Sequence, residues 1–185
     1  MISGVVLAGG KSSRFGSDKG LHPFRGKPLV MHALDILRPH CGELMISTNK
    51  PDAYAFTGIS LVADVFPGCG PMAGIHSALS QSGGEILMAV GCDIPLLPSA
   101  IFGFMLERMG EHQVVMPVYN GFTETMCAIY HRSCLQEIEH ALHEKTFRIL
   151  DVVARMNTLY VGIDREPFCR PGMFRNINTL QDLPG

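Results

Sequence analysis

The chain begins with an apolar run that passes without a break into a glycine-rich and basic segment, Ile2-Ser3-Gly4-Val5-Val6-Leu7-Ala8-Gly9-Gly10-Lys11-Ser12-Ser13-Arg14-Phe15-Gly16-Ser17-Asp18-Lys19. The run from Ile2 to Ala8 is short and rich in β-branched residues, and it ends at Gly9-Gly10, which predicts a buried strand followed by a loop. In open α/β folds, ligands bind beyond the carboxyl ends of the strands. This stretch therefore predicts both the class of fold and the place of a ligand site.

Strand and helix patterns alternate along the rest of the chain. Short apolar runs predict strands over residues 44–47, 61–63, 86–90, 114–118 and 126–130. Apolar residues at helical spacing predict helices over residues 28–37, 71–79, 101–109 and about 147–156, and one that begins after the N-cap candidate Ser133. The alternation predicts a three-layer α/β/α, Rossmann-like fold with a mostly parallel central sheet. Without a repeat or a linker, residues 1–185 are expected to form a single domain.

Composition narrows the classes of protein that the chain can belong to. Of 185 residues, 46% are hydrophobic, which is enough to build a core and excludes a wholly disordered chain. The net charge of −2 gives no sign of a nucleic-acid partner or of an anionic membrane surface. The longest apolar runs are far shorter than the roughly 18–20 residues that span a bilayer.

The sequence also gives expectations for the cellular compartment and for the oligomeric state. No signal peptide is visible at Met1, and the six cysteines contain no C-x-x-C pair, so they are expected to be free thiols in a reducing compartment. No heptad seam is evident either. We expect a cytoplasmic protein that is monomeric and that has no nucleic-acid or membrane partner.

The opening segment concentrates positive charge in a chain that is otherwise slightly acidic. Lys11, Arg14 and Lys19 lie within nine residues of one another, among glycines that allow backbone N–H groups to approach phosphate oxygens. Arginine offers a planar fork for such oxygens, and lysine a point charge. The segment therefore predicts a phosphate site, and the alternative is an ordinary glycine turn with solvated lysines. A P-loop is excluded, because its first glycine would have to stand where the chain has Val5.

Two aspartates are predicted to follow strands at the same edge of the sheet as this segment. Asp93 comes after the strand over residues 86–90, and Asp64 comes directly after Leu61-Val62-Ala63. A carboxylate in that position suits Mg²⁺ held against phosphate oxygens, because this ion prefers hard oxygen ligands. Each aspartate alone could equally be a cap or turn residue. The two together, beside a basic glycine loop, indicate nucleotide and metal chemistry.

These motifs resemble the signature of the molybdenum cofactor guanylyltransferase family, within the wider glycosyltransferase-A-like nucleotidyltransferases. The opening segment matches as Leu7-Ala8-Gly9-Gly10-x-Ser12-x-Arg14-Phe15-Gly16-x-Asp18-Lys19. Three further segments agree in order and spacing, namely Gly70-Pro71-Met72-Ala73-Gly74-Ile75, Cys92-Asp93-Ile94-Pro95 and Phe174-Arg175-Asn176-Ile177-Asn178-Thr179-Leu180-Gln181-Asp182-Leu183. The resemblance covers essentially the whole chain. It implies that the terminal phosphate of molybdenum-carrying molybdopterin attacks the α-phosphorus of GTP and that pyrophosphate leaves.

The resemblance also implies a nucleotide pocket. By match to the family, the backbone of the first strand's end lines the guanine and ribose, and side chains from the following loops contact the phosphates and the rest of the nucleotide. The implied nucleotide contacts are Leu7, Ala8, Gly9, Gly10, Lys19, Asn49, Asp64 and Asp93.

The same match assigns roles in the reaction. Arg14, Lys19 and Asp93 are implied as catalytic residues: Arg14 stabilises charge on the triphosphate, Lys19 contacts the phosphates, and Asp93 holds Mg²⁺ as the cofactor. Asn176 and Asn178 are expected near the molybdopterin acceptor. Beyond GTP and this acceptor, the labile product implies partner proteins that deliver molybdopterin and that receive the finished cofactor.

Two other functions remain open at this point. A related cytidylyltransferase would use CTP, although Gly9-Gly10 followed by Gly70-Pro71 resembles the guanylyl branch more than the Ala-Ala-Gly of cytidylyl relatives. A non-catalytic nucleotide-binding protein could keep the fold without turnover. Retention of Lys19 and Asp93 argues against the second alternative.

Overall fold

The computed structural model describes residues 1–9 and 18–177 of the chain. Four of the residues given a role above, Gly10, Lys11, Arg14 and Asn178, lie outside the described residues. The sequence-based roles of these four therefore stay predictions.

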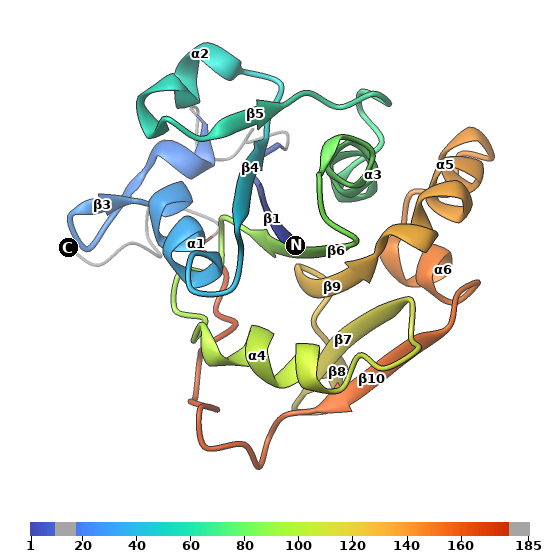
Figure 1. Cartoon of the computed structure of the whole chain (residues 1–185). Helices are drawn as coiled ribbons and strands as arrows, with labels where there is room; N and C mark the ends of the chain where they lie inside the picture. Colours follow the sequence, from blue (N-terminus) through green and yellow to red (C-terminus); the bar gives the residue numbers. More distant parts are fainter. Residues whose placement is uncertain (10–17, 178–185) are drawn as a thin grey trace.

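A single eight-stranded sheet organises the described part of the chain (Figure 1). Its strands are β1 Ile2–Leu7, β4 Glu43–Ser47, β5 Ser60–Val62, β6 Ile86–Gly91, β7 Val114–Tyr119, β8 Phe122–Thr123, β9 Cys127–His131 and β10 Thr158–Gly162. The order is β10-β7-β9-β6-β1-β4-β5, with β8 paired to β7. Strands β5, β4, β1 and β6 are parallel to one another, whereas β9 runs antiparallel to both β6 and β7. A separate hairpin pairs β2 Pro23–Phe24 with β3 Lys27–Pro28.

Helices cover both faces of the sheet, so the chain has three layers, as the sequence predicts. The helices are α1 Leu29–Leu37, α2 Pro51–Tyr54, α3 Pro71–Gln81, α4 Ala100–Glu107, α5 Leu135–His143 and α6 Ile149–Val153. Figure 1 shows α1 and α4 on one face, and α3, α5 and α6 on the other. No helix in the described ranges is both long and apolar enough to cross a membrane.

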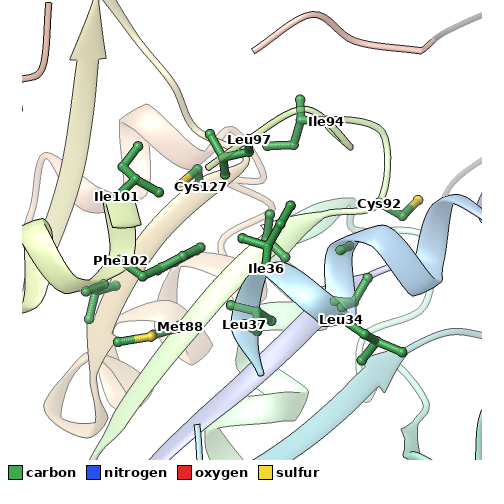
Figure 2. Close-up of a cluster of buried hydrophobic side chains, with 14 of the residues drawn as sticks. Leu34, Ile36, Leu37, Met88, Cys92, Ile94, Leu97, Ile101, Phe102 and Cys127 are labelled. Carbon is green, nitrogen blue, oxygen red and sulfur yellow. The ribbon is translucent and has the colours of Figure 1, made fainter. Parts of the chain in front are cut away.

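Strand β1 contributes alternately to two hydrophobic cores. Val6 packs with α1 and α4, and Val5 and Leu7 pack with α3 and its neighbours. In the first core, Leu37 of α1 and Phe102 of α4 meet over the sheet, where both are fully buried (Figure 2). A strand that is buried on both faces reads as a continuous apolar run, which is why it was recognisable in the sequence.

The structure departs from the expected elements at several places. Strands β2, β3, β8 and β10 and helix α2 were not predicted, and the helix expected over residues 147–156 extends only over Ile149–Val153. The N-cap prediction for Ser133 was wrong, because Ser133 lies inside a short 3-10 turn, Arg132–Cys134. The His131 ring accepts a hydrogen bond from the Ser133 backbone N–H at 3.2 Å, so His131 takes the capping role.

Candidate nucleotide-binding site

A cavity of about 440 Å³ lies beyond the carboxyl ends of β1, β4 and β5. The chain leaves β1 through α1 to reach β4, and it leaves β5 through α3 to reach β6 on the other side of β1. Such a reversal of direction opens a crevice in which α/β proteins bind their ligands. The cavity is lined by Leu7, Ala8, Gly9, Asp18, Ser47, Thr48, Asn49, Lys50, Asp64, Gly68, Gly70, Pro71 and Gly74.

Glycines bring the wall formed by α3 close to the strands. A Cβ at Gly74 would lie 2.5 Å from the Ser47 Oγ atom and 3.0 Å from a methyl group of Leu7. Gly70, which precedes the first residue of α3, has a φ of 71°, a conformation that side chains rarely adopt. Pro71 then provides the first turn of the helix. The segment from Gly70 to Gly74 is therefore the part of the chain that lets α3 approach the cavity.

Asp64 is held by a network of hydrogen bonds on one side of the cavity. The Asn49 amide donates to Asp64 Oδ2 at 2.8 Å, and the Asp64 backbone N–H donates to Asn49 Oδ1 at 3.2 Å. Ser47 Oγ donates to Asp64 Oδ1 at 3.3 Å. The structure thus brings together Asp64 and Asn49, as expected, and adds Ser47 as a third member. The carboxylate enters the cavity with its orientation already fixed.

Lys19 and Asp93 form an ion pair between distant parts of the chain. Lys19 Nζ lies 3.0 Å from Asp93 Oδ2, and each side chain is 19% exposed. The pair adjoins the cavity, because Asp18 lines it and because the Cys92 N–H donates to the carbonyl of Leu7, another lining residue, at 3.3 Å. Two residues that the sequence assigned to the same reaction therefore meet in the folded chain.

The second carboxylate oxygen of Asp93 has no partner among the described residues, so it is available to another ligand. Asp93 Oδ1 is buried and has no hydrogen-bond partner there. A buried oxygen without a partner is costly, so its presence calls for an explanation such as a bound ion. The described residues hold no group of three or more His, Cys, Asp or Glu side chains that could bind a metal. Mg²⁺ fits this arrangement, since it takes one or two carboxylates and completes its shell with phosphate oxygens and water.

The segment that contains Asn176 and Ile177 is hydrogen-bonded to the backbone of Asp93. The Ile177 N–H donates to the Asp93 carbonyl oxygen at 2.8 Å, and the Ile177 side chain is buried with Phe24 and Leu29. Asn176 precedes this anchor and is exposed. The predicted acceptor residue Asn176 therefore lies next to the backbone of Asp93.

The cysteine next to Asp93 is not set up to act as a nucleophile. All six cysteines fall within the described ranges and are free thiols, as the sequence predicts. Burial, and then the neighbouring Asp93 carboxylate, raise the pKa of the Cys92 thiol to about 12. A thiol that stays protonated at neutral pH is a poor nucleophile.

Some residues around the cavity carry no signal in the sequence. Lys50 lines the cavity and places its Nζ atom 3.6 Å from Asp18 Oδ2. Tyr54 is fully buried and donates a hydrogen bond from its hydroxyl to Asp18 Oδ1. Both come from the segment that follows Asn49, and proximity to Asn49 was the only hint that could have pointed to them.

The comparisons with known proteins agree with this geometry. Residues 4–157 match the model of a family described as the MobA-like NTP transferase domain. The chain belongs to this family. It is therefore a nucleotidyltransferase by family, with the mostly parallel α/β fold that the sequence predicts.

Individual relatives in the family align over nearly their full length. A probable molybdenum cofactor guanylyltransferase of Carboxydothermus hydrogenoformans is 34% identical over 180 residues, which are 96% of this chain and 91% of the relative. The molybdenum cofactor guanylyltransferase of Desulfosudis oleivorans is 31% identical, with 98% and 92% covered. Among solved structures, molybdopterin-guanine dinucleotide biosynthesis protein A of Archaeoglobus fulgidus superposes with a TM-score of 0.81 at 25% identity, covering 97% of this chain and 94% of that one.

We expect Lys19→Ala to slow nucleotidyl transfer strongly without unfolding the protein. Removing one preorganised cation costs about 2–4 kcal/mol of transition-state stabilisation, which is roughly 30- to 1,000-fold in rate. The matched control is Lys27→Ala, which removes an exposed ion pair with Asp35. Steady-state kinetics on both variants measure the effect. A Lys19→Ala rate within twofold of wild type would exclude Lys19 from the reaction.

Asn49→Ala tests the network that holds Asp64. Losing the amide leaves one carboxylate oxygen without its closest donor, and removal of a hydrogen bond to a charged group costs about 1.5–3 kcal/mol. We therefore expect nucleotide affinity, measured by calorimetry, to fall by roughly tenfold or more. Asn157→Ala is the control, because Asn157 lies at the amino end of β10, away from the cavity. Equal affinities of the two variants would show that the network does not orient Asp64 for binding.

Proposed function

We propose that this protein transfers GMP from GTP to the terminal phosphate of molybdenum-molybdopterin, with release of pyrophosphate and formation of the guanine dinucleotide form of the cofactor. The observation that carries the proposal is the Lys19–Asp93 pair beside the cavity, with one Asp93 oxygen left free among the described residues. The guanylyltransferase activity named for its relatives supports the choice of GTP and of molybdopterin as substrates.

The chemistry asks for positioning and charge stabilisation. An oxygen of the acceptor phosphate forms a bond to the α-phosphorus, and the bond from that phosphorus to the bridging oxygen breaks, so that pyrophosphate leaves with the electron pair. No covalent intermediate on the protein is needed. Lys19 supplies a cation that can follow the charge as it moves to the leaving group.

We propose Mg²⁺ as the cofactor, held by Asp93. Lys19 occupies Oδ2, and the buried Oδ1 has no partner among the described residues, so one carboxylate can serve the lysine and the ion at once. The ion would act there as a Lewis acid on phosphate oxygens.

The two ends of the site accept different substrates in this proposal. GTP occupies the cavity, where Asp64 and Asn49 line one side. Molybdopterin approaches from the side of Asn176 in this proposal, which is supported by the hydrogen bond from the neighbouring Ile177 N–H to the Asp93 carbonyl. We keep the assignments of Gly10 to the nucleotide, Arg14 to the triphosphate and Asn178 to the acceptor as predictions from the sequence.

The proposal extends to the compartment, the oligomeric state and the partner proteins. We propose a cytoplasmic monomer that receives molybdopterin from one protein and passes its labile product to another. The excess of acidic over basic residues, with a net charge of −2, supports small-molecule phosphates bound at a local site over nucleic acid as the substrate.

Thermal unfolding with Mg²⁺ and each of GTP, CTP, ATP and UTP tests the choice of nucleotide. A ligand at 100 times its dissociation constant stabilises the folded state by about 2.7 kcal/mol. For a chain of this size, that raises the midpoint by about 5–10 °C. We expect this shift with GTP alone. A shift with CTP alone would make the protein a cytidylyltransferase, and no shift with any nucleotide would contradict the binding of GTP to the free protein.

Asp93→Asn tests the role of the carboxylate in metal binding. The amide keeps the size of the side chain but removes its charge, so we expect Mg²⁺-dependent turnover to fall at least 100-fold while the fold is retained. Titration of the variant with Mn²⁺ in the presence of nucleotide measures metal affinity directly. The exposed Asp151→Asn is the control. Unchanged metal affinity in Asp93→Asn would place the metal site elsewhere.

A further inference from the structure

Tyr54 ends the short helix α2 and is fully buried, although it follows a loop at the cavity edge. Its hydroxyl donates a hydrogen bond to Asp18 Oδ1. Burial, together with the hydrogen bond to Asp18, raises the pKa of Tyr54 well above its ordinary value, so the hydroxyl keeps its proton. Tyr54 is therefore hydrogen-bonded to Asp18, the residue that precedes Lys19 in a different segment of the chain.

The residues before and after Lys19, Asp18 and Gly20, both contact Tyr54. The Asp18 side chain is only 11% exposed, and its Oδ1 also accepts from the Gly20 backbone N–H at 3.3 Å. Gly20 is buried directly against the Tyr54 ring, where a Cβ would overlap the hydroxyl oxygen. Both neighbours of Lys19 in the chain are thus fixed by Tyr54.

Backbone hydrogen bonds make the turn rigid. The Leu21 N–H donates to the Asp18 carbonyl at 3.2 Å, and the His22 N–H donates to the Lys19 carbonyl at 3.1 Å. From this fixed backbone the Lys19 side chain reaches Asp93, 74 residues away in the chain. Because lysine has a long and flexible side chain, the place of its ammonium depends on how firmly its own backbone is held.

We propose that Tyr54 is a positioning residue for Lys19: through Asp18 and Gly20, it orients the turn from which Lys19 reaches Asp93 and the nucleotide phosphates. The part about the phosphates rests on the proposed function, whereas the part about the Lys19–Asp93 contact does not. Tyr54 touches neither substrate in this proposal and acts only through the turn.

Tyr130 in β9 supplies a matched control. It is as completely buried as Tyr54, but its hydroxyl has no hydrogen-bond partner among the described residues. It packs in the core on the α3 and α5 side of the sheet. Removing a buried hydroxyl without a partner is nearly neutral, so Tyr130→Phe should fold and work like the wild type.

The first experiment compares Tyr54→Phe with Tyr130→Phe under identical conditions. Phenylalanine keeps the ring and removes only the hydroxyl. We expect Tyr54→Phe to lower kcat by about tenfold or more, as for loss of a hydrogen bond to a charged group, with KM for GTP within about threefold. A Tyr54→Phe enzyme with wild-type kcat would overturn the proposal.

A double-mutant cycle separates positioning from a general structural effect. If Tyr54 acts through Lys19, then Tyr54→Phe should change kcat by less than about twofold in a Lys19→Ala background, because there is no ammonium left to position. An equal loss of kcat in both backgrounds would mean that Tyr54 acts on stability or on another group, and the proposal would fall.

Crystal structures of Tyr54→Phe and Tyr130→Phe give a readout that needs no turnover. We expect the Lys19 Nζ to Asp93 Oδ2 distance to exceed 4 Å in Tyr54→Phe and to stay near 3.0 Å in Tyr130→Phe. A contact retained in Tyr54→Phe would overturn the proposal even if the enzyme acts on other substrates. The two proposals can fail separately. If the wild type shows no guanylyl transfer, the proposed function is overturned. If the Lys19–Asp93 contact is nevertheless lost in Tyr54→Phe, the positioning role of Tyr54 is supported.

Discussion

The site depends on the burial of β1 between two parallel neighbours. The strand is covered on both faces, and its pairing with β4 and β6 fixes where all three strands end. Hydrogen bonds continue this pairing into the loops, because the Ala8 N–H donates to the Ser47 carbonyl at 3.0 Å and the Cys92 N–H donates to the Leu7 carbonyl. The loops that carry Asn49 and Asp93 therefore begin at fixed points beside the opening segment.

The two aspartates of the site have different environments, and this difference separates their roles. Both oxygens of Asp64 accept hydrogen bonds, from Ser47 and from Asn49. Asp93 has one oxygen on Lys19 and one buried oxygen with no partner among the described residues. A carboxylate oriented by hydrogen bonds to both of its oxygens is suited to hold a shape, whereas one with a buried oxygen that lacks a partner is suited to take an ion. The hydrogen-bonding environment thus supports Asp93, rather than Asp64, as the ligand of the proposed metal.

Much of this arrangement could be predicted from the sequence because it follows from local pattern and from one topological rule. Buried parallel strands read as apolar runs, and their carboxyl ends share an edge, so Asp64, Asp93 and the opening segment were expected together. Strand β10 was missed because its burial pattern is mixed and its pairing with β7 joins segments far apart in the chain. The Ser133 prediction failed because the side chain of a residue two positions earlier, His131, satisfies the N–H of Ser133 itself. Tyr54 was invisible for a related reason: a lone buried tyrosine has no pattern, and its partner Asp18 lies 36 residues away.

Asp93 also links two distant segments of the chain. Its side chain pairs with Lys19, and its carbonyl accepts a hydrogen bond from the Ile177 N–H, which follows Asn176. Strand β6, which leads to Asp93, pairs with β1 in the parallel half of the sheet and with β9 in the antiparallel half. Reacting groups that must be aligned to within a fraction of an ångström are best supported by one rigid element. Strand β6 meets this requirement for the proposed reaction, because Asp93, which follows it, contacts both Lys19 and the segment that contains Asn176.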